Sequence, residues 1–138
     1  MALRYMLDSN ACICLIARKS GYAKLAEKIT ALEPEEIGLS TIVVAELRYG
    51  VSKSAHKKTN AEALEQFLLP FLVIPFDESA SNVYGDVRAE LEAKGKTIGP
   101  LDTLIAAHAL SVGVVLVTDN LREFSRVPGL KVENWLRR

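Results

Sequence analysis

The chain has 138 residues, of which 49% are hydrophobic and 25% are charged. A chain of this size and composition is expected to form one globular domain with one core, spanning residues 1–138. Its 17 basic and 17 acidic residues give a formal net charge of zero, which excludes a bulk cationic surface for coating nucleic acid or membranes. The sequence contains no apolar run of membrane-spanning length and no signal-peptide pattern, so we expect a cytoplasmic protein.

Short apolar runs alternate with segments of helical periodicity along the chain. The expected strands are Leu3–Leu7, Ile37–Leu39, Phe71–Phe76, Val114–Val117 and a last one near Leu130–Val132. The expected helices cover 12–17, 23–32, Ile42 to near Gly50, 57–69, 78–94 and 100–112, with a helical turn after Asn120. Strands joined by helices require crossover connections, so the order predicts an α/β fold. We expect a three-layer α/β/α sandwich with a central, mainly parallel sheet.

Four acidic residues stand out, two at expected strand ends and two in the first or second turns of expected helices. Asp8 follows the first strand and Asp119 follows the fourth. Glu46 lies beside the apolar stripe of the helix after the second strand, and Asp102 is the third residue of the helix that begins at Pro100. Because ligand sites of parallel sheets form at the carboxyl ends of the strands, these four acids are candidates for one shared site.

Each of these acids also has a simpler structural interpretation. Asp8 and Asp119 can cap the helices that follow them, and Asp102 can complement the positive end of a helix dipole. Glu46 can point away from the packed face of its helix as an ordinary surface glutamate. The functional interpretation therefore depends on the four acids converging in space.

Clustered carboxylates repel one another unless a cation neutralises them, so convergence implies a metal site. The candidate ligands are hard oxygens without histidine or cysteine at ligand spacing, which favours Mg²⁺ or Mn²⁺, as one or two ions. Such ions activate water and stabilise charge on a phosphoryl oxygen, so the chemistry indicated is phosphodiester hydrolysis. We expect His108, on the alanine-rich helix, to be a hydrogen-bonded packing residue rather than a general base.

Four segments of the sequence carry a family resemblance. They are MLDSN, STIVVAELRYG, IGPLDTLIAAHAL and LVTDNLREFSRVPGLKVENW, in this order over nearly the whole chain. Together they resemble the PIN-domain ribonucleases, and specifically the VapC toxins of bacterial toxin–antitoxin pairs. The resemblance implies a PIN-like fold and a Mg²⁺- or Mn²⁺-dependent endoribonuclease, a hydrolase of RNA phosphodiester bonds. It also implies a homodimer that a VapB-like antitoxin neutralises in a higher assembly.

The resemblance assigns catalytic and metal-binding roles to particular residues. The family's strand-end aspartate falls on Asp8, its helix glutamate on Glu46 and its late helical aspartate on Asp102. The fourth acidic position is open, because the family pattern T-x-D places Asn120 where the aspartate often stands and leaves Asp119 one residue early. The resemblance also indicates polar residues that would hydrogen bond to the acids or lie next to them. These are Asn10, Ser40, Thr118 and Asn120.

An RNA substrate needs basic contacts, because a group of acids repels phosphate. The candidate RNA-binding residues are Arg88, Lys94, Lys96 and Arg122, although each can equally be a solvated surface charge. By resemblance the target is a tRNA, such as initiator tRNA, or another structured RNA, such as a ribosomal loop. The sequence does not choose between them.

Partner and alternative functions follow from the same features. An antitoxin tail that places an Arg among the acids would mimic the charge of the metal. The aliphatic helices between Ser9 and Leu69 are a candidate dimer interface.

One alternative function is a non-catalytic PIN-fold module that binds RNA or protein. A Mg²⁺-dependent phosphoacceptor receiver domain fits less well, because Asp8 is followed by Ser9 rather than by a second acid.

Overall fold

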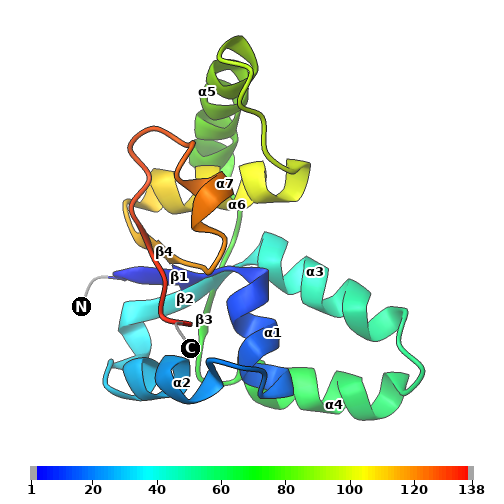
Figure 1. The fold of residues 1–138 in the computed structure, drawn as a ribbon. Coiled ribbons are helices and arrows are strands. Elements are labelled where there is room, and N and C mark those ends of the chain that lie inside the picture. Colours follow the sequence, from blue (N-terminus) through cyan, green and yellow to red (C-terminus); the bar gives the residue numbers. More distant parts are fainter. Residues whose placement is uncertain (1–2, 137–138) are drawn as a thin grey trace.

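The computed structural model describes residues 3–136 (Figure 1). A parallel sheet of five strands, in the order β3-β2-β1-β4-β5, forms the centre of this part of the chain. The strands are β1 (Tyr5–Leu7), β2 (Ile37–Ser40), β3 (Leu72–Ile74), β4 (Val115–Val117) and β5 (Val132–Glu133). The predicted parallel sheet is therefore confirmed, with most strands shorter than the apolar runs suggest.

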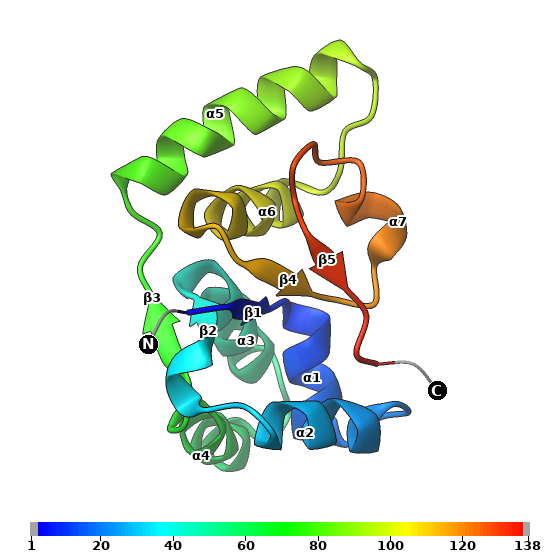
Figure 2. The same ribbon diagram turned by 90° about the vertical axis from the view of Figure 1, so that its left-hand side faces the viewer.

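Helices cover both faces of the sheet. They are α1 (Ser9–Ala17), α2 (Tyr22–Thr30), α3 (Thr41–Ser52), α4 (Lys57–Leu68), α5 (Glu78–Ala93), α6 (Pro100–Val112) and α7 (Leu121–Phe124), with a 3₁₀ turn η1 (Pro34–Glu36). Figures 1 and 2 show α5 and α6 on one side of the sheet and α1, α2 and α4 on the other. The three-layer architecture is as predicted. None of the helices described between residues 3 and 136 has the length and apolar character to cross a membrane.

The two central strands are buried on both faces. Met6 and Leu7 of β1 and Leu116 and Val117 of β4 have no solvent-exposed surface. Helices on both sides explain why these strands are continuously apolar rather than alternating. Burial of each such side chain contributes on the order of 1.5–3 kcal/mol to folding, so the middle of the sheet is the most stable part of the scaffold.

The register of the sheet aligns the ends of β1 and β4. Leu7 pairs with Val117, and the Asp8 amide donates a hydrogen bond to the Val117 carbonyl at 3.1 Å. The residues that follow the two strands, Asp8 and Thr118, are consequently neighbours although 110 positions separate them in sequence. This alignment creates the edge on which the candidate acids meet.

The observed ends of some elements differ by a few residues from the predicted ends. The sequence predicts that α3 ends near Gly50, but the backbone of Gly50 is not left-handed and the helix continues to Ser52. The predicted ending of α6 at Gly113 is confirmed, with φ of +74° there. The last strand begins later than expected, since Leu130 is held in a turn by a bond from its amide to the Val127 carbonyl.

A buried polar pair joins the end of β2 to α6. Ser40 is fully buried, caps α3 by accepting a hydrogen bond from the Ile42 amide at 3.0 Å, and lies 2.8 Å from His108 Nδ1. Burial lowers the pKa of His108, against the opposing effect of the Asp77 charge. His108 also packs edge-on against Phe76 at 5.4 Å. His108 is thus a hydrogen-bonded packing residue, as predicted.

Replacing Ser40 with Ala should lower the free energy of unfolding by about 2 kcal/mol, because it removes a helix cap and leaves a buried imidazole nitrogen without its partner. Urea denaturation would measure the change. Ser52→Ala, at an exposed position near the end of the same helix, is the matched control and should change stability by less than about 0.5 kcal/mol. Equal stability of the Ser40→Ala variant and the native chain would contradict this account of the pair.

Candidate active site

Asp8 is the most buried of the candidate acids, with 3% of its surface exposed. Its Oδ1 accepts a hydrogen bond from the Ala11 amide at 2.9 Å, so Asp8 caps α1. Its Oδ2 accepts one from the Thr118 hydroxyl at 2.5 Å. Capping and site formation are therefore not alternatives, because the cap holds the carboxylate in place at the carboxyl end of the sheet.

Glu46 reaches the same region from the second turn of α3. The Ser9 hydroxyl, next in sequence to Asp8, donates a hydrogen bond to Glu46 Oε1 at 2.6 Å. Ser40 fixes the start of α3 through its cap, and this determines where the second turn lies. The bond from Ser9 thus ties the glutamate of one helix to the first turn of another.

Asp102 belongs to the first turn of α6, which begins at Pro100 directly after Gly99. A Cβ atom on Gly99 would lie 3.5 Å from Asp102 Oδ2, so the carboxylate rests over the glycine backbone. Proline at the first helical position fixes the chain direction there without losing a needed hydrogen bond. The loop before α6 therefore forms one wall beside this carboxylate.

The segment after β4 supplies the last polar residues of the site, Asp119, Asn120 and Glu123. The Asn120 amide donates to Thr118 Oγ1 at 2.9 Å, and Asn120 Nδ2 donates to Glu123 Oε2 at 2.8 Å. The sequence reasoning did not select Glu123. Its position three residues after Asn120, on the helical turn that follows β4, was the only signal available.

The electrostatics show which carboxylates interact. Burial raises the pKa of Asp8 to about 6, hydrogen bonds from Thr118 and Ala11 oppose this, and the charges of Asp119 and Asp102 add to the increase. Burial also raises the pKa of Asp102 to about 6, with further contributions from the charges of Glu123 and Glu46. The four predicted acids and Glu123 therefore share one negative field, as convergence at a strand edge requires.

This group of acids suits a hard divalent cation, because every interacting side chain is a carboxylate with oxygen ligands. A cation would also relieve the repulsion that contributes to the raised pKa values of Asp8 and Asp102. In the described part of the chain, no three acidic, histidine or cysteine side chains are already arranged to hold a metal ion. Glu46 and Glu123 accept hydrogen bonds from Ser9 and Asn120 through one oxygen each, so a bound ion would share these carboxylates with those bonds.

The remaining predicted site residues occupy varied positions. Thr118 and Asn120 contact acidic side chains directly, Ser40 contacts His108 instead, and Asn10 is exposed on the first turn of α1.

Among the predicted RNA-binding residues, Arg88 and Lys94 each form an ion pair with a glutamate one turn away. Lys96 and Arg122 are exposed and have no acidic partner within residues 3–136.

Comparison with known proteins agrees with this geometry. The family model of the PIN domain matches residues 5–130. Curated relatives include Ribonuclease VapC2 of Rickettsia felis, 43% identical over 95% of this chain and 97% of the relative. They also include the tRNA(fMet)-specific endonuclease VapC of Salmonella typhimurium, 41% identical over 96% of this chain and 98% of the relative.

Similar solved structures come from the same two organisms. The structure of VapBC2 from Rickettsia felis, bound to a DNA fragment from its promoter, matches with a TM-score of 0.86 at 41% identity, over 96% of this chain and 99% of that chain. DNA-bound VapBC from Salmonella typhimurium matches with a TM-score of 0.88 at 39% identity, over 96% and 98%.

A parallel sheet with acids at its central strand ends, together with these matches, defines the class of protein. The chain belongs to the PIN-domain family and, within it, to the VapC ribonucleases. PIN-domain nucleases generally use divalent metal ions.

The raised pKa of Asp8 predicts a pH-dependent stability difference. In the metal-free protein the pKa of Asp8 is about 6, against an ordinary value of 3.8. The folded state therefore binds more protons than the unfolded state across this window, and Asp8 costs stability as pH rises from about 4 to about 6. The variant Asp8→Asn should become progressively more stable relative to the native chain over that range and keep a constant advantage above it.

Urea denaturation in EDTA at several pH values would measure this difference. Asp86→Asn, at an exposed acid on α5, is the control and should show no such trend. A stability difference between the Asp8→Asn variant and the native chain that does not change with pH would contradict the electrostatic account of the site.

Proposed function

We propose that this chain is a Mg²⁺- or Mn²⁺-dependent endoribonuclease and the toxin of a toxin–antitoxin pair. The single observation that carries the proposal is the electrostatic interaction among Asp8, Glu46 and Asp102, which come from the end of β1, from α3 and from α6 and meet at the carboxyl end of the sheet. A binding module would gain nothing from carboxylates that raise one another's pKa. A site that holds a cation needs this arrangement.

Asp8 and Asp102 are the proposed principal metal ligands, and Glu46, Asp119 and Glu123 are candidates for the remaining positions around one or two ions. When bound, the ion would lower the pKa of a water molecule and stabilise the charge that develops on a phosphoryl oxygen. Thr118 and the Ala11 amide hold the Asp8 carboxylate in a fixed orientation. Glu46 is held through Oε1 by Ser9, which leaves Oε2 to accept the proton of the attacking water.

The proposed substrate is initiator tRNA, because relatives with about 40% identity over nearly their full length are named tRNA(fMet)-specific endonucleases. Phosphate contacts from this chain would come first from Lys96 and Arg122, since Arg88 and Lys94 are already paired with glutamates. Single-stranded loops are the parts of a tRNA whose bases a protein can reach. Cleavage within a loop is therefore expected.

Purified native protein should cleave tRNA in Mn²⁺ or Mg²⁺ into discrete fragments, and EDTA should prevent this. Asp8→Asn and Asp102→Asn should each reduce the rate by roughly 100-fold or more, because each removes a charge that holds the metal. Sequencing of the fragment ends would identify the RNA and the bond.

Asp86→Asn serves as the control and should retain the native rate, since Asp86 lies on the exposed surface of α5. Binding of tRNA without cleavage in any metal would favour the non-catalytic PIN-fold module. Cleavage that persists in both aspartate variants would place the active site elsewhere.

The proposed antitoxin contact is an apolar groove between α1, α3 and α4. The cavity has a volume of about 270 Å³, and its lining includes the partly exposed Ile13 and Ile16, the buried Leu47 and Leu64, and Glu46. An amphipathic helix fits such a groove, and a basic residue at its end would reach the acidic field at Glu46. Relatives of this chain have been solved as VapBC complexes, which supports a VapB-like partner here.

The variant Ile13→Glu should prevent co-purification of a co-expressed VapB-like antitoxin, because it would bury a charge in the apolar groove. Val112→Glu, at a similarly exposed apolar position on α6, is the control and should bind normally. Light scattering of the toxin alone would test the predicted homodimer. A dimer that becomes a monomer in the Ile13→Glu variant would show that a second copy, rather than an antitoxin helix, occupies the groove.

A further inference from the structure

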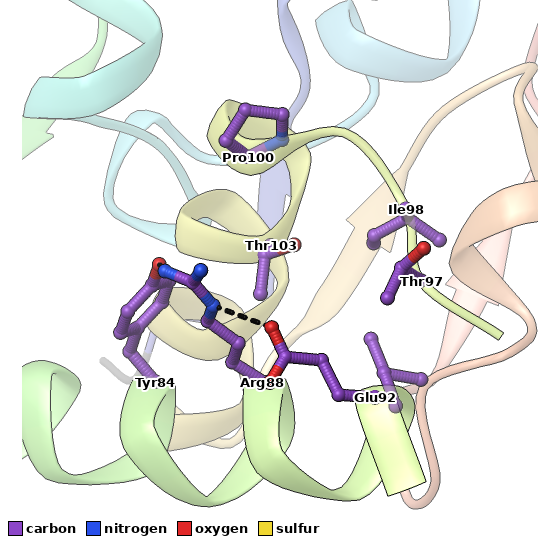
Figure 3. A pocket seen from close by; sticks show the side chains of 8 residues that line it. Tyr84, Arg88, Glu92, Thr97, Ile98, Pro100 and Thr103 are labelled. Atoms are coloured by element: carbon purple, nitrogen blue, oxygen red, sulfur yellow. Dashed lines mark hydrogen bonds and ion pairs between the residues drawn. The ribbon is translucent and has the colours of Figure 1, made fainter. Parts of the chain in front are cut away.

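A second cavity lies between α5 and α6, away from the groove. Its volume is about 230 Å³, far more than one ordered water needs, since a water occupies about 30 Å³ of the liquid. Tyr84, Arg88 and Glu92 project into it side by side from α5, and Thr103 and Ile98 face them from α6 and its preceding loop (Figure 3). Leu91 and Thr103, at its base, are buried. The cavity thus combines a polar wall, formed by Tyr84, Arg88 and Glu92, with an apolar lining from Leu91, Ile98 and Pro100.

The polar wall presents donors and acceptors in a fixed arrangement. Arg88 Nε donates to Glu92 Oε2 at 3.0 Å, and Arg88 Nη1 donates to the Tyr84 hydroxyl at 3.0 Å. These bonds leave Arg88 Nη2 and Glu92 Oε1 without a hydrogen bond from any residue between 3 and 136. The Arg88–Glu92 pair therefore keeps a free donor nitrogen, Nη2, and a free acceptor oxygen, Oε1, beside the Tyr84 side chain that lines the same cavity.

The wall suits a base better than a phosphate. Glu92 neutralises Arg88, so the pair offers no net positive charge to the RNA backbone. Adjacent donor and acceptor groups instead match the edge of an unpaired base, and tyrosine and guanidinium planes are surfaces on which such bases stack. Arg88 thereby acquires a role different from the phosphate contact that its charge alone suggests.

The cavity also lies beside the acidic site. Thr97, Ile98 and Pro100 line it, and they flank Gly99, over which the Asp102 carboxylate rests. The loop is held in place by Arg126, which donates a hydrogen bond to the Thr97 carbonyl at 2.9 Å. A single ordered loop therefore separates the cavity from the carboxylates, close to where the scissile phosphate would bind.

We propose that this cavity is a subsite for one unpaired guanine of the RNA, adjacent to the bond that is cleaved, and this assignment rests on the proposed function. Guanine carries two neighbouring donors, N1–H and the 2-amino group, for the Glu92 carboxylate, whose Oε1 is free and whose Oε2 keeps a second lone pair beside its bond from Arg88. Its O6 would accept from Arg88 Nη2, one of the two guanine acceptors that arginine recognises in nucleic acids. Glu92 and Arg88 are therefore residues that determine specificity, and they take no part in the chemistry.

Binding of the four ribonucleoside 5′-monophosphates to the native protein in EDTA, followed by calorimetry or NMR, tests the subsite without any catalysis. GMP should bind about tenfold more tightly than AMP, the discrimination expected of one good base-specific contact. IMP, which lacks the 2-amino group, should fall between them. Glu92→Gln should bring the GMP to AMP ratio close to one.

Glu90→Gln is the matched control, because Glu90 forms an ion pair of the same spacing and the same 3.0 Å length with Lys94 on the same helix. Both glutamates are exposed, so neither substitution should affect folding. Release of Lys94 would strengthen binding of every nucleotide alike and leave the ratio between bases unchanged. A ratio near one in the native protein, or equal loss of the ratio in both variants, would overturn the proposal.

Sequencing of cleaved ends from an RNA pool with random loops gives the second measurement. A guanine preference next to the cut should be present in the native protein and the Glu90→Gln variant and absent in Glu92→Gln. Metal-dependent cleavage without any guanine preference would refute the subsite and leave the proposed function intact. Selective GMP binding by a protein that cleaves no RNA would support the cavity as a guanine site and refute the proposed function.

Discussion

The hydrogen bond from the Thr118 hydroxyl to Asp8 is the interaction on which the site depends. It joins the ends of the two central strands, and it orients a carboxylate that is almost completely buried. The fold supports this ionisable group with two hydrogen bonds, from Thr118 and Ala11, yet its pKa remains raised. The protein therefore maintains an unfavourable electrostatic arrangement at the centre of its most stable region, as functional sites commonly do.

The neighbouring acids depend on the same scaffold. Ser40 starts α3 at the end of β2 and contacts His108 of α6, so a single buried pair relates the helix that carries Glu46 to the helix that carries Asp102. None of these contacts touches an acidic oxygen. Their effect is geometric, because they determine how closely negative charges from separate helices approach one another. The stability of this part of the fold and the charge density of the site are thus set by the same residues.

Much of this arrangement could be predicted from the sequence. Continuous apolar runs followed by acids indicated a parallel sheet with its site at the strand ends, and Gly113 marked a helix end through its left-handed backbone. Glu123 was missed because its contribution depends on how α7 turns back toward Asp102, which local periodicity does not encode. The pairing of Arg88 with Glu92 follows from helical spacing, but the cavity beside the pair exists only because α6 packs across α5.

The sequence separation of 110 residues between Thr118 and Asp8 also bears on when the site forms during synthesis. Strand β1 is synthesised well before β4, the strand that pairs with it, and before Thr118, whose hydroxyl orients the Asp8 carboxylate. Domains form their long-range contacts as units, so an incomplete chain lacks the assembled acidic edge. A nascent copy of this protein therefore cannot assemble its acidic edge until Thr118 has been added and has paired with Asp8.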